Sequence, residues 1–193
     1  MVPLSEGRIQ DRCSRPFRGG RNQLHGRNMN AIEIVPIAQG DIDGFHRALD
    51  IVAREGRYLA FLEAPPIEAT RAFVLDNIKR GHPQFVAVSA DGEVVGWCDV
   101  TPLSRPIQAH RGVFGVGLLP QFRGQGIGTK LTKKALAAAR AFGLHRVELT
   151  VREHNTGAIE LYRKEGFEIE GVQRDAVLVD GAYEDVVCMA VVF

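Results

Sequence analysis

The most constraining feature of the sequence is an apolar strand that runs directly into a glycine-rich turn and then into a helix, over residues 118–131. Glycine occupies three alternating positions in the turn, at Gly124, Gly126 and Gly128. Glycine reaches backbone conformations that other residues avoid, and it lets a ligand approach the main chain closely. The exposed amides of such a turn, with a helix N-terminus behind them, form a binding site for an anion such as phosphate.

The segment before this turn predicts one strand and two helices. Residues 32–37 alternate between apolar and polar side chains, as a strand does. Apolar residues recur at helical spacing over 42–52 and predict an amphipathic helix. An apolar connector with one carboxylate follows over 58–64. A pair of prolines then begins a second helix, which Gly81 closes.

Two Asp-Gly pairs are each flanked by strand-like residues, which predicts two β-hairpins. The pairs are Asp91-Gly92, between 84–89 and 93–101, and Asp180-Gly181, between 167–179 and 182–192. The remaining elements are a strand at 110–118, a helix from the glycine turn to about 142, a strand at 145–152 and a helix at 156–165. This order predicts an α/β fold of the α+β type, with a mixed, mostly antiparallel sheet of about seven strands flanked by four helices.

Composition narrows the class of protein. The 193 residues suit one domain with a full hydrophobic core, and a net charge of +1 gives no overall reason to expect nucleic acid. The three cysteines, Cys13, Cys98 and Cys188, are odd in number and form no CxxC pair, which fits a reducing compartment. No apolar run approaches the roughly 20 residues of a membrane span. We therefore expect a soluble, cytoplasmic protein without a membrane partner.

The first 29 residues differ from the rest of the chain. Arginine, glycine and proline are frequent there, and the arginines oppose only Glu6 and Asp11. The segment has no apolar stretch of the kind that a secretory signal contains. We expect residues 1–29 to be a disordered, Arg-rich extension and residues 30–193 to be the single domain. A transit peptide or a nucleic-acid-binding arm is the alternative that such a tail leaves open, although we expect no nucleic-acid partner.

Two familiar phosphate-binding motifs do not match the glycine turn. A P-loop requires GxxxxGK[ST], and here Gly128 is followed by Thr129-Lys130. A dinucleotide-binding turn requires GxGxxG after a first strand, and Thr129 stands where the third glycine belongs. The hairpin that precedes the turn also disagrees with a βαβ unit. These mismatches argue against a nucleotide as the main ligand.

Residues 123–128, Arg-Gly-Gln-Gly-Ile-Gly, resemble the (Gln/Arg)-x-x-Gly-x-(Gly/Ala) loop of the GNAT superfamily of N-acetyltransferases. Residues 155–167 resemble its N-x-x-A-x-x-L-Y-x-x-x-G-F segment, at the separation and in the order that the family shows. The resemblance covers about residues 32–193 and implies the GNAT fold. It is closest to the bacterial branch with an Arg-Asp-x-x-x-x-Asp-Gly-x-Tyr hairpin, here 174–183, whose members acetylate small amines, amino acids or polyamines.

The resemblance implies that acetyl-CoA is the acetyl donor. Backbone amides of the glycine turn would hold its pyrophosphate, and the strand ending at Leu118 would pair with its pantetheine arm and polarise the thioester carbonyl. The histidines show no ligand-pair spacing, so we expect no metal. The cofactor-binding residues that the resemblance implies are Leu118, Arg123, Gly124, Gln125, Gly126, Ile127, Gly128, Thr129, Asn155 and Ala158.

The resemblance also implies that the Tyr162 hydroxyl is the general acid that protonates the departing thiolate. Tyr162 lies two helical turns after Asn155, on the same helix face and roughly 10 Å along the axis. The residues leave the general base open. His110 and Glu63 are the first candidates, and Asp99 is a third. The family often places a glutamate in the strand before the turn, and residues 113–118 contain none.

We therefore expect an acetyl-CoA-dependent N-acetyltransferase that acts on a primary amine of a small molecule, by direct attack of the amine in a ternary complex. The first alternative keeps the reaction but makes the acceptor a protein N-terminus or a lysine. The second is a sensor that binds acyl-CoA without catalysis. The sequence leaves the oligomeric state open, and the apolar strand 186–193 is the segment that we expect to pair across a homodimer if one forms.

Overall fold

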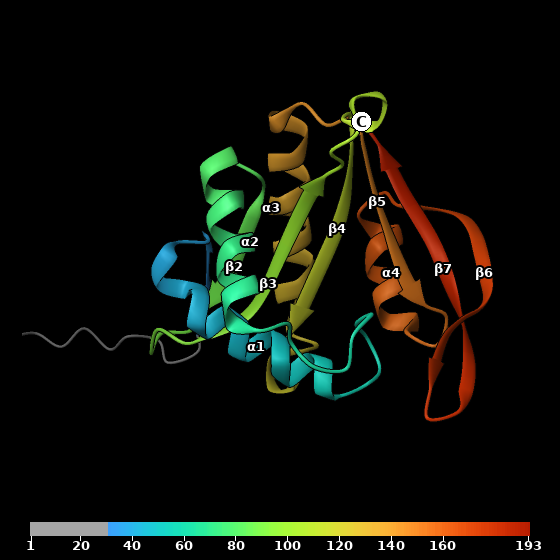
Figure 1. The fold of residues 1–193 in the computed structure, drawn as a ribbon, viewed down its shortest axis with the longest axis horizontal. Coiled ribbons are helices and arrows are strands. Elements are labelled where there is room, and N and C mark those ends of the chain that lie inside the picture. The colour runs from blue at the N-terminus through green and yellow to red at the C-terminus, as the bar shows by residue number, and fades with distance from the viewer. Residues whose placement is uncertain (1–30) are drawn as a thin grey trace, which may run out of the picture.

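The computed structural model describes residues 31–193, and the predicted Arg-rich extension lies outside the described residues. Seven strands and four helices make up this part of the chain, as the sequence predicts (Figure 1). The strands are β1 (Glu33–Pro36), β2 (Gln84–Val88), β3 (Val94–Pro102), β4 (Arg111–Leu118), β5 (Arg146–Arg152), β6 (Glu168–Val179) and β7 (Ala182–Val192). The helices are α1 (Ile42–Arg54), α2 (Ile67–Arg80), α3 (Ile127–Phe142) and α4 (Thr156–Lys164).

The strands form one sheet in the order β1-β2-β3-β4-β5-β7-β6. Every neighbouring pair is antiparallel except β4 and β5, which run parallel. The predicted α+β fold with a mixed, mostly antiparallel sheet is therefore confirmed. Strand β7 lies between β5, which pairs with Val186–Val192, and β6, which pairs with residues from Ala182 to Ala190. Residues 186–190 therefore already have a strand on each side, and pairing of this segment across a homodimer stays a prediction.

The helices cover both faces of the sheet, and alternate residues of β3 show which helix lies on which face. The Trp97 ring packs edge-on against Phe45 of α1, with 5.7 Å between the ring centroids. The next residue, Cys98, points the other way, and its thiol donates a hydrogen bond to the Leu131 carbonyl of α3. The first two helices thus share one face and α3 lies on the opposite one (Figure 1).

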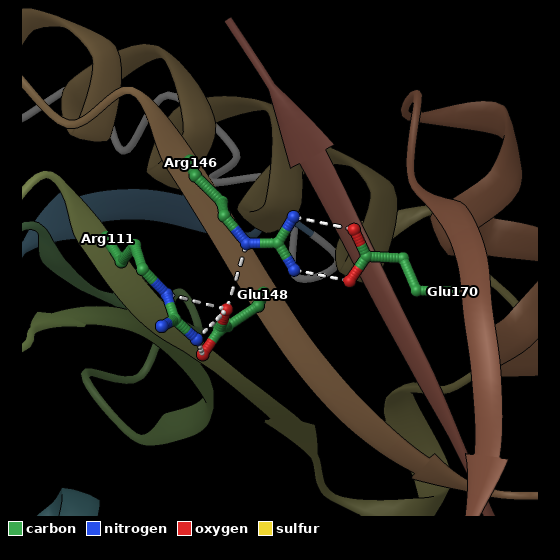
Figure 2. A network of polar contacts seen from close by, with 4 residues as sticks. All are labelled: Arg111, Arg146, Glu148 and Glu170. Carbon is green, nitrogen blue, oxygen red and sulfur yellow. Dashed lines mark hydrogen bonds and ion pairs between the residues drawn. The ribbon is translucent and has the colours of Figure 1, made fainter. Parts of the chain in front are cut away.

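An ionic network fastens the one place where β4 and β5 are paired. Arg111 of β4 donates a bidentate pair of hydrogen bonds to Glu148 of β5, the shorter at 2.7 Å. Arg146 of β5 contacts Glu148 at 3.0 Å and also holds Glu170 of β6, so four charges bridge three strands (Figure 2). Burial alone would raise the pKa of Glu148, but the hydrogen bonds and charges of the two arginines outweigh it and hold the pKa below its usual value.

We predict that Glu148→Gln lowers the free energy of unfolding by about 1–2 kcal/mol at pH 7, because two neighbouring arginines lose their shared, largely buried carboxylate. Because the folded-state pKa of Glu148 is depressed, its stabilisation is present above the ordinary pKa and is lost as the pH falls through the folded value. The difference between variant and wild type should therefore vanish in acid. Urea denaturation across the pH range measures it.

Glu168→Gln is the matched control, because Glu168 is an exposed strand residue that forms no ion pair with a described residue. We expect this substitution to change stability by less than about 0.5 kcal/mol. Equal effects of the two substitutions at pH 7 would contradict a stabilising role of the network.

Candidate functional site

The sheet opens between β4 and β5. The two strands pair only through three consecutive residues, Arg111–Val113 against Arg146–Glu148. Beyond Val113 the strands diverge, as Figure 1 shows, while the other edge of β4 stays paired with β3 as far as Leu118. The last five residues of β4 therefore have one edge that pairs with no other strand of the described part of the chain.

Backbone alternation decides which groups face this open edge. The Leu119 amide donates to the Val95 carbonyl of β3 at 2.9 Å. Successive residues of a strand direct their backbone groups to opposite sides, so the amides of Val116 and Leu118 face the opening. The Leu118 carbonyl faces the same way and accepts a hydrogen bond from Arg123 Nε at 3.0 Å. The opening thus presents two amide donors in a row, spaced as in a sheet edge.

A cavity of about 450 Å³ lies in this opening. It is bounded by the end of β4, by the glycine turn, by the first two turns of α4 and by Tyr58 of the connector between α1 and α2. Nearly all of the predicted cofactor-binding residues and the predicted acid meet there. They are Leu118, Arg123, Gly124, Gly126, Gly128, Thr129, Asn155, Ala158 and Tyr162.

Two of the predicted cofactor-binding residues do not line the cavity with the others. The side chain of Gln125 is exposed, and its amide nitrogen donates to the Gln121 carbonyl at 3.0 Å. Ile127 is 4% exposed and packs into the core. Any contact of these two residues with a ligand therefore depends on their backbone.

The glycine turn has the backbone geometry that an anion site needs. Gly124 and Gly126 have φ angles of +72° and +76°, with no atom within 4 Å of the position that a Cβ would take, so the backbone conformation itself favours glycine. Gly126 caps α3 without a side chain, and no acidic residue stands in the first turn of that helix. Its first amides, at the positive end of the helix dipole, have no capping group among residues 31–193.

The side chain of Arg123 is bound within the protein. It forms an ion pair with Glu55 at the end of α1, and its guanidinium lies over the Tyr58 ring at 4.8 Å. The hydrogen bond to Glu55 is the main reason why the pKa of Arg123 is raised. This arginine joins the glycine turn to the connector, and its charge is already balanced by a carboxylate rather than left free for a phosphate.

Helix α4 brings Asn155 and Tyr162 to the cavity. Asn155 caps the helix as predicted, because its side-chain oxygen accepts a hydrogen bond from the Ala158 amide at 3.3 Å. Tyr162 is 8% exposed, and its ring packs against Phe114 and Phe167. Burial raises the pKa of the Tyr162 hydroxyl well above its ordinary value. The phenol therefore keeps its proton through the physiological range and can only give it to a stronger base.

A second cavity, of about 370 Å³, lies on the face of the sheet that α1 and α2 cover. Val116 lines both cavities, so the two meet at the open end of β4. Asp99 of β3 lines the second cavity opposite Gly115, where a Cβ would lie 3.4 Å from the carboxylate. Burial raises the pKa of Asp99 to about 7, against a smaller lowering by the hydrogen bond from Thr101.

The structure does not bring the other two predicted base candidates to either cavity. His110 is exposed at the beginning of β4, at the opposite end of the strand from Leu118. Glu63 is 75% exposed and lies 3.6 Å from Arg54 at the surface. Of the three candidates, Asp99 is the one that lines a cavity.

Sequence reasoning missed Arg152, which holds the connector that contributes residues to both cavities. This arginine is 5% exposed, and its guanidinium donates to the carbonyls of Gly56 and Leu59 at 2.7 and 3.1 Å. The connector places Tyr58 in the first cavity and Leu59 in the second. No pattern in the sequence indicates this role, because a single arginine at the end of a strand is usually exposed to solvent.

Comparisons with known proteins agree with this geometry. The model of the Acetyltransferase (GNAT) family matches residues 49–167. The chain belongs to the GNAT acetyltransferase family. The L-amino acid N-acetyltransferase AaaT of Escherichia coli K12 is 34% identical over 111 residues, which are 57% of this chain and 68% of that protein. The predicted family and enzyme class are therefore confirmed.

Two solved structures show the same fold. A GNAT-family acetyltransferase from Streptococcus pneumoniae superposes with a TM-score of 0.79 at 24% identity, over 84% of this chain and 100% of that one. A phosphinothricin acetyltransferase from Sinorhizobium meliloti in complex with acetyl-CoA has a TM-score of 0.78 at 19% identity, over 82% and 86%. Within residues 31–193, no helix is long and apolar enough to cross a membrane.

Proposed function

We propose that this N-acetyltransferase moves the acetyl group of acetyl-CoA to a primary amine of a small molecule, by direct attack of the amine while both substrates are bound. The observation that carries the proposal is the meeting of two different cavities at Val116. One presents strand amides and a helix N-terminus that no described residue pairs with or caps. The other is apolar and has one carboxylate, on Asp99.

The first cavity fits acetyl-CoA. The amides of Val116 and Leu118 would bind the pantetheine arm as a neighbouring strand would, and the first amides of α3 would bind the pyrophosphate. The related phosphinothricin acetyltransferase was solved with acetyl-CoA, which supports this donor. Acetyl-CoA supplies an acetyl thioester, whose carbonyl carbon the acceptor nitrogen attacks. The Leu118 amide is the donor that would stabilise the negative charge on the carbonyl oxygen.

Tyr162 is the proton donor for the leaving sulfur. It lines the donor cavity, and burial keeps its hydroxyl protonated. As the carbon–sulfur bond breaks, the sulfur gains negative charge and becomes a base that can take the phenol proton. The aromatic packing of Phe114 and Phe167 around the ring fixes its position.

Asp99 binds the acceptor nitrogen and takes a proton from it. An ammonium cannot attack, so it first gives one proton to the carboxylate, which passes it to solvent. The amine nitrogen then bonds to the carbonyl carbon and loses a second proton, which replaces the one that Tyr162 gave to sulfur. Asp99 and Leu118 lie on adjacent strands, roughly 10 Å apart along the strand direction, so an acceptor or a water must link them.

We predict that Tyr162→Phe lowers kcat at least about 100-fold and changes the KM for acetyl-CoA by less than about twofold, because the ring stays and the proton donor goes. Thiol release from acetyl-CoA measures both constants. Initial-velocity lines at varied concentrations of the two substrates should intersect, as a ternary complex requires.

An unchanged kcat would exclude Tyr162 as the acid, and parallel lines would exclude direct attack. Turnover of peptide N-termini or lysines in place of small amines would favour a protein acceptor. Binding of acetyl-CoA without turnover of any amine would favour a sensor.

We also predict that kcat/KM for the acceptor rises with pH up to about 7 and then levels, because Asp99 must be ionised to take the proton. Asp99→Asn should abolish this rise of kcat/KM with pH and lower kcat/KM at least about 100-fold. Thr101→Val removes the hydrogen bond that stabilises the ionised form of Asp99, so the rise of kcat/KM should move to higher pH. A pH profile that is the same in all three proteins would contradict the role of Asp99.

A further inference from the structure

The second cavity is built almost entirely from apolar side chains. Helices α1 and α2 and the connector supply three phenylalanines and several aliphatic residues, and β3 supplies a tryptophan. The four aromatic residues are Phe45, Phe61, Phe73 and Trp97. Burial of apolar surface is the main source of affinity in a cavity of this kind. The cavity therefore favours an acceptor whose body is apolar.

Among the residues that line this cavity, Asp99 is the only ionisable one. No arginine or lysine lines this cavity among the described residues, and three arginines of α1 and α2 form ion pairs elsewhere: Arg54 with Asp50, Arg71 with Asp43 and Arg80 with Asp76. A carboxylate on the acceptor would be buried near Asp99 without a counter-charge, which is costly. One carboxylate in the wall balances one ammonium, and a second ammonium would find no second carboxylate there.

Thr70 of α2 provides an independent sign of a ligand. It lines the same cavity and is 4% exposed. Its hydroxyl oxygen is buried and has no hydrogen-bond partner within the described residues. Buried hydroxyls are normally paired, because an unpaired one loses its hydrogen bonds to water. A bound acceptor with a neutral hydrogen-bonding group would satisfy it.

We propose that the acceptor is an apolar primary monoamine, alkyl or aralkyl, without a carboxylate, and that Thr70 selects among such amines for a neutral hydrogen-bonding group. This inference rests on the proposed acetyl transfer and names its acceptor class. The step is the same as above: the nitrogen–carbon bond forms, the carbon–sulfur bond breaks, Asp99 takes a proton from nitrogen and Tyr162 gives one to sulfur. The relative AaaT is named for amino acids, so the two proteins would differ in acceptor.

Matched pairs of acceptors test the class directly. Phenethylamine differs from L-phenylalanine, and 3-methylbutylamine from L-leucine, only by the carboxylate. We expect the monoamine of each pair to have at least a tenfold higher kcat/KM in thiol release from acetyl-CoA. An equal or higher value for the amino acid, or for spermidine, would overturn the inference and leave acetyl transfer standing. Silence with every amine, spermidine and peptides included, would overturn the proposed function as well.

A cation added to the cavity wall should reverse the preference. Phe61 lines the cavity and is 38% exposed, so Phe61→Arg can be accommodated at the surface and would supply the missing counter-charge. We expect it to raise the kcat/KM ratio of L-phenylalanine to phenethylamine at least tenfold. Phe142→Arg is the control, because Phe142 is 42% exposed at the end of α3 and lines neither cavity. If Phe61→Arg leaves the ratio of L-phenylalanine to phenethylamine unchanged, the charge argument is contradicted. If that variant loses all turnover, the comparison of amine and amino acid pairs in the wild-type protein decides.

Thr70→Val removes the hydroxyl and keeps the shape of the side chain. We expect it to lower kcat/KM for hydroxylated aralkylamines, such as tyramine and its ring isomers, at least fivefold relative to phenethylamine. Thr70→Ser restores the hydroxyl and should restore the preference, which a purely structural role would not explain. Equal effects of Thr70→Val on all of these amines would overturn the selective role of Thr70.

Discussion

The loss of pairing between β4 and β5 beyond Val113 is the feature on which the rest of this structure depends. The sheet consists of two antiparallel blocks, β1 to β4 and β5-β7-β6, and only three residue pairs join them. β5 remains paired with β7 along its whole length, and β4 remains paired with β3. Each strand therefore follows its own block, and the twist of the two blocks opens the sheet on one side. The ionic network of Arg111, Glu148, Arg146 and Glu170 fastens the joined end (Figure 2).

The opening divides the chemistry between two faces of one strand. The backbone of β4 supplies amides at the split, where the glycine turn and α4 complete the first cavity. On the face toward α1 and α2, Gly115 and Gly117 leave room beside Asp99 and Trp97. A Cβ on Gly117 would lie 2.2 Å from the Trp97 ring. In the proposed reaction, these glycines would let an acceptor in the second cavity reach a thioester in the first near Val116. Arg123 and Arg152 hold the connector, which contributes Tyr58 to the first cavity and Leu59 to the second.

Local patterns in the sequence predicted most of the fold and picked out most of the residues that line the first cavity, because those signals are confined to short segments. The two Asp-Gly pairs correctly predicted both hairpins. Gly81 and Gly143 end their helices with left-handed φ angles, and Asn155 caps α4 as expected. The second cavity could not be predicted from the sequence, because side chains from segments far apart in the chain line it. His110 was chosen for its pKa range, yet a strand of eight residues carries it roughly 25 Å from the open end. Nothing in the sequence marked Thr70 as a cavity residue, because a single threonine within a largely polar helix is equally typical of the surface.

The exchange of single backbone amides for deuterium tests the central claim, that the unpaired end of β4 is the edge on which acetyl-CoA binds. Peptide amides that gain a hydrogen-bond partner exchange more slowly. Acetyl-CoA should slow exchange at Val116, at Leu118 and in the first turn of α3. It should leave the paired residues 111–113 and the distant hairpin of β6 and β7 unchanged. Equal exchange at Val116 and Leu118 with and without saturating acetyl-CoA would contradict the account.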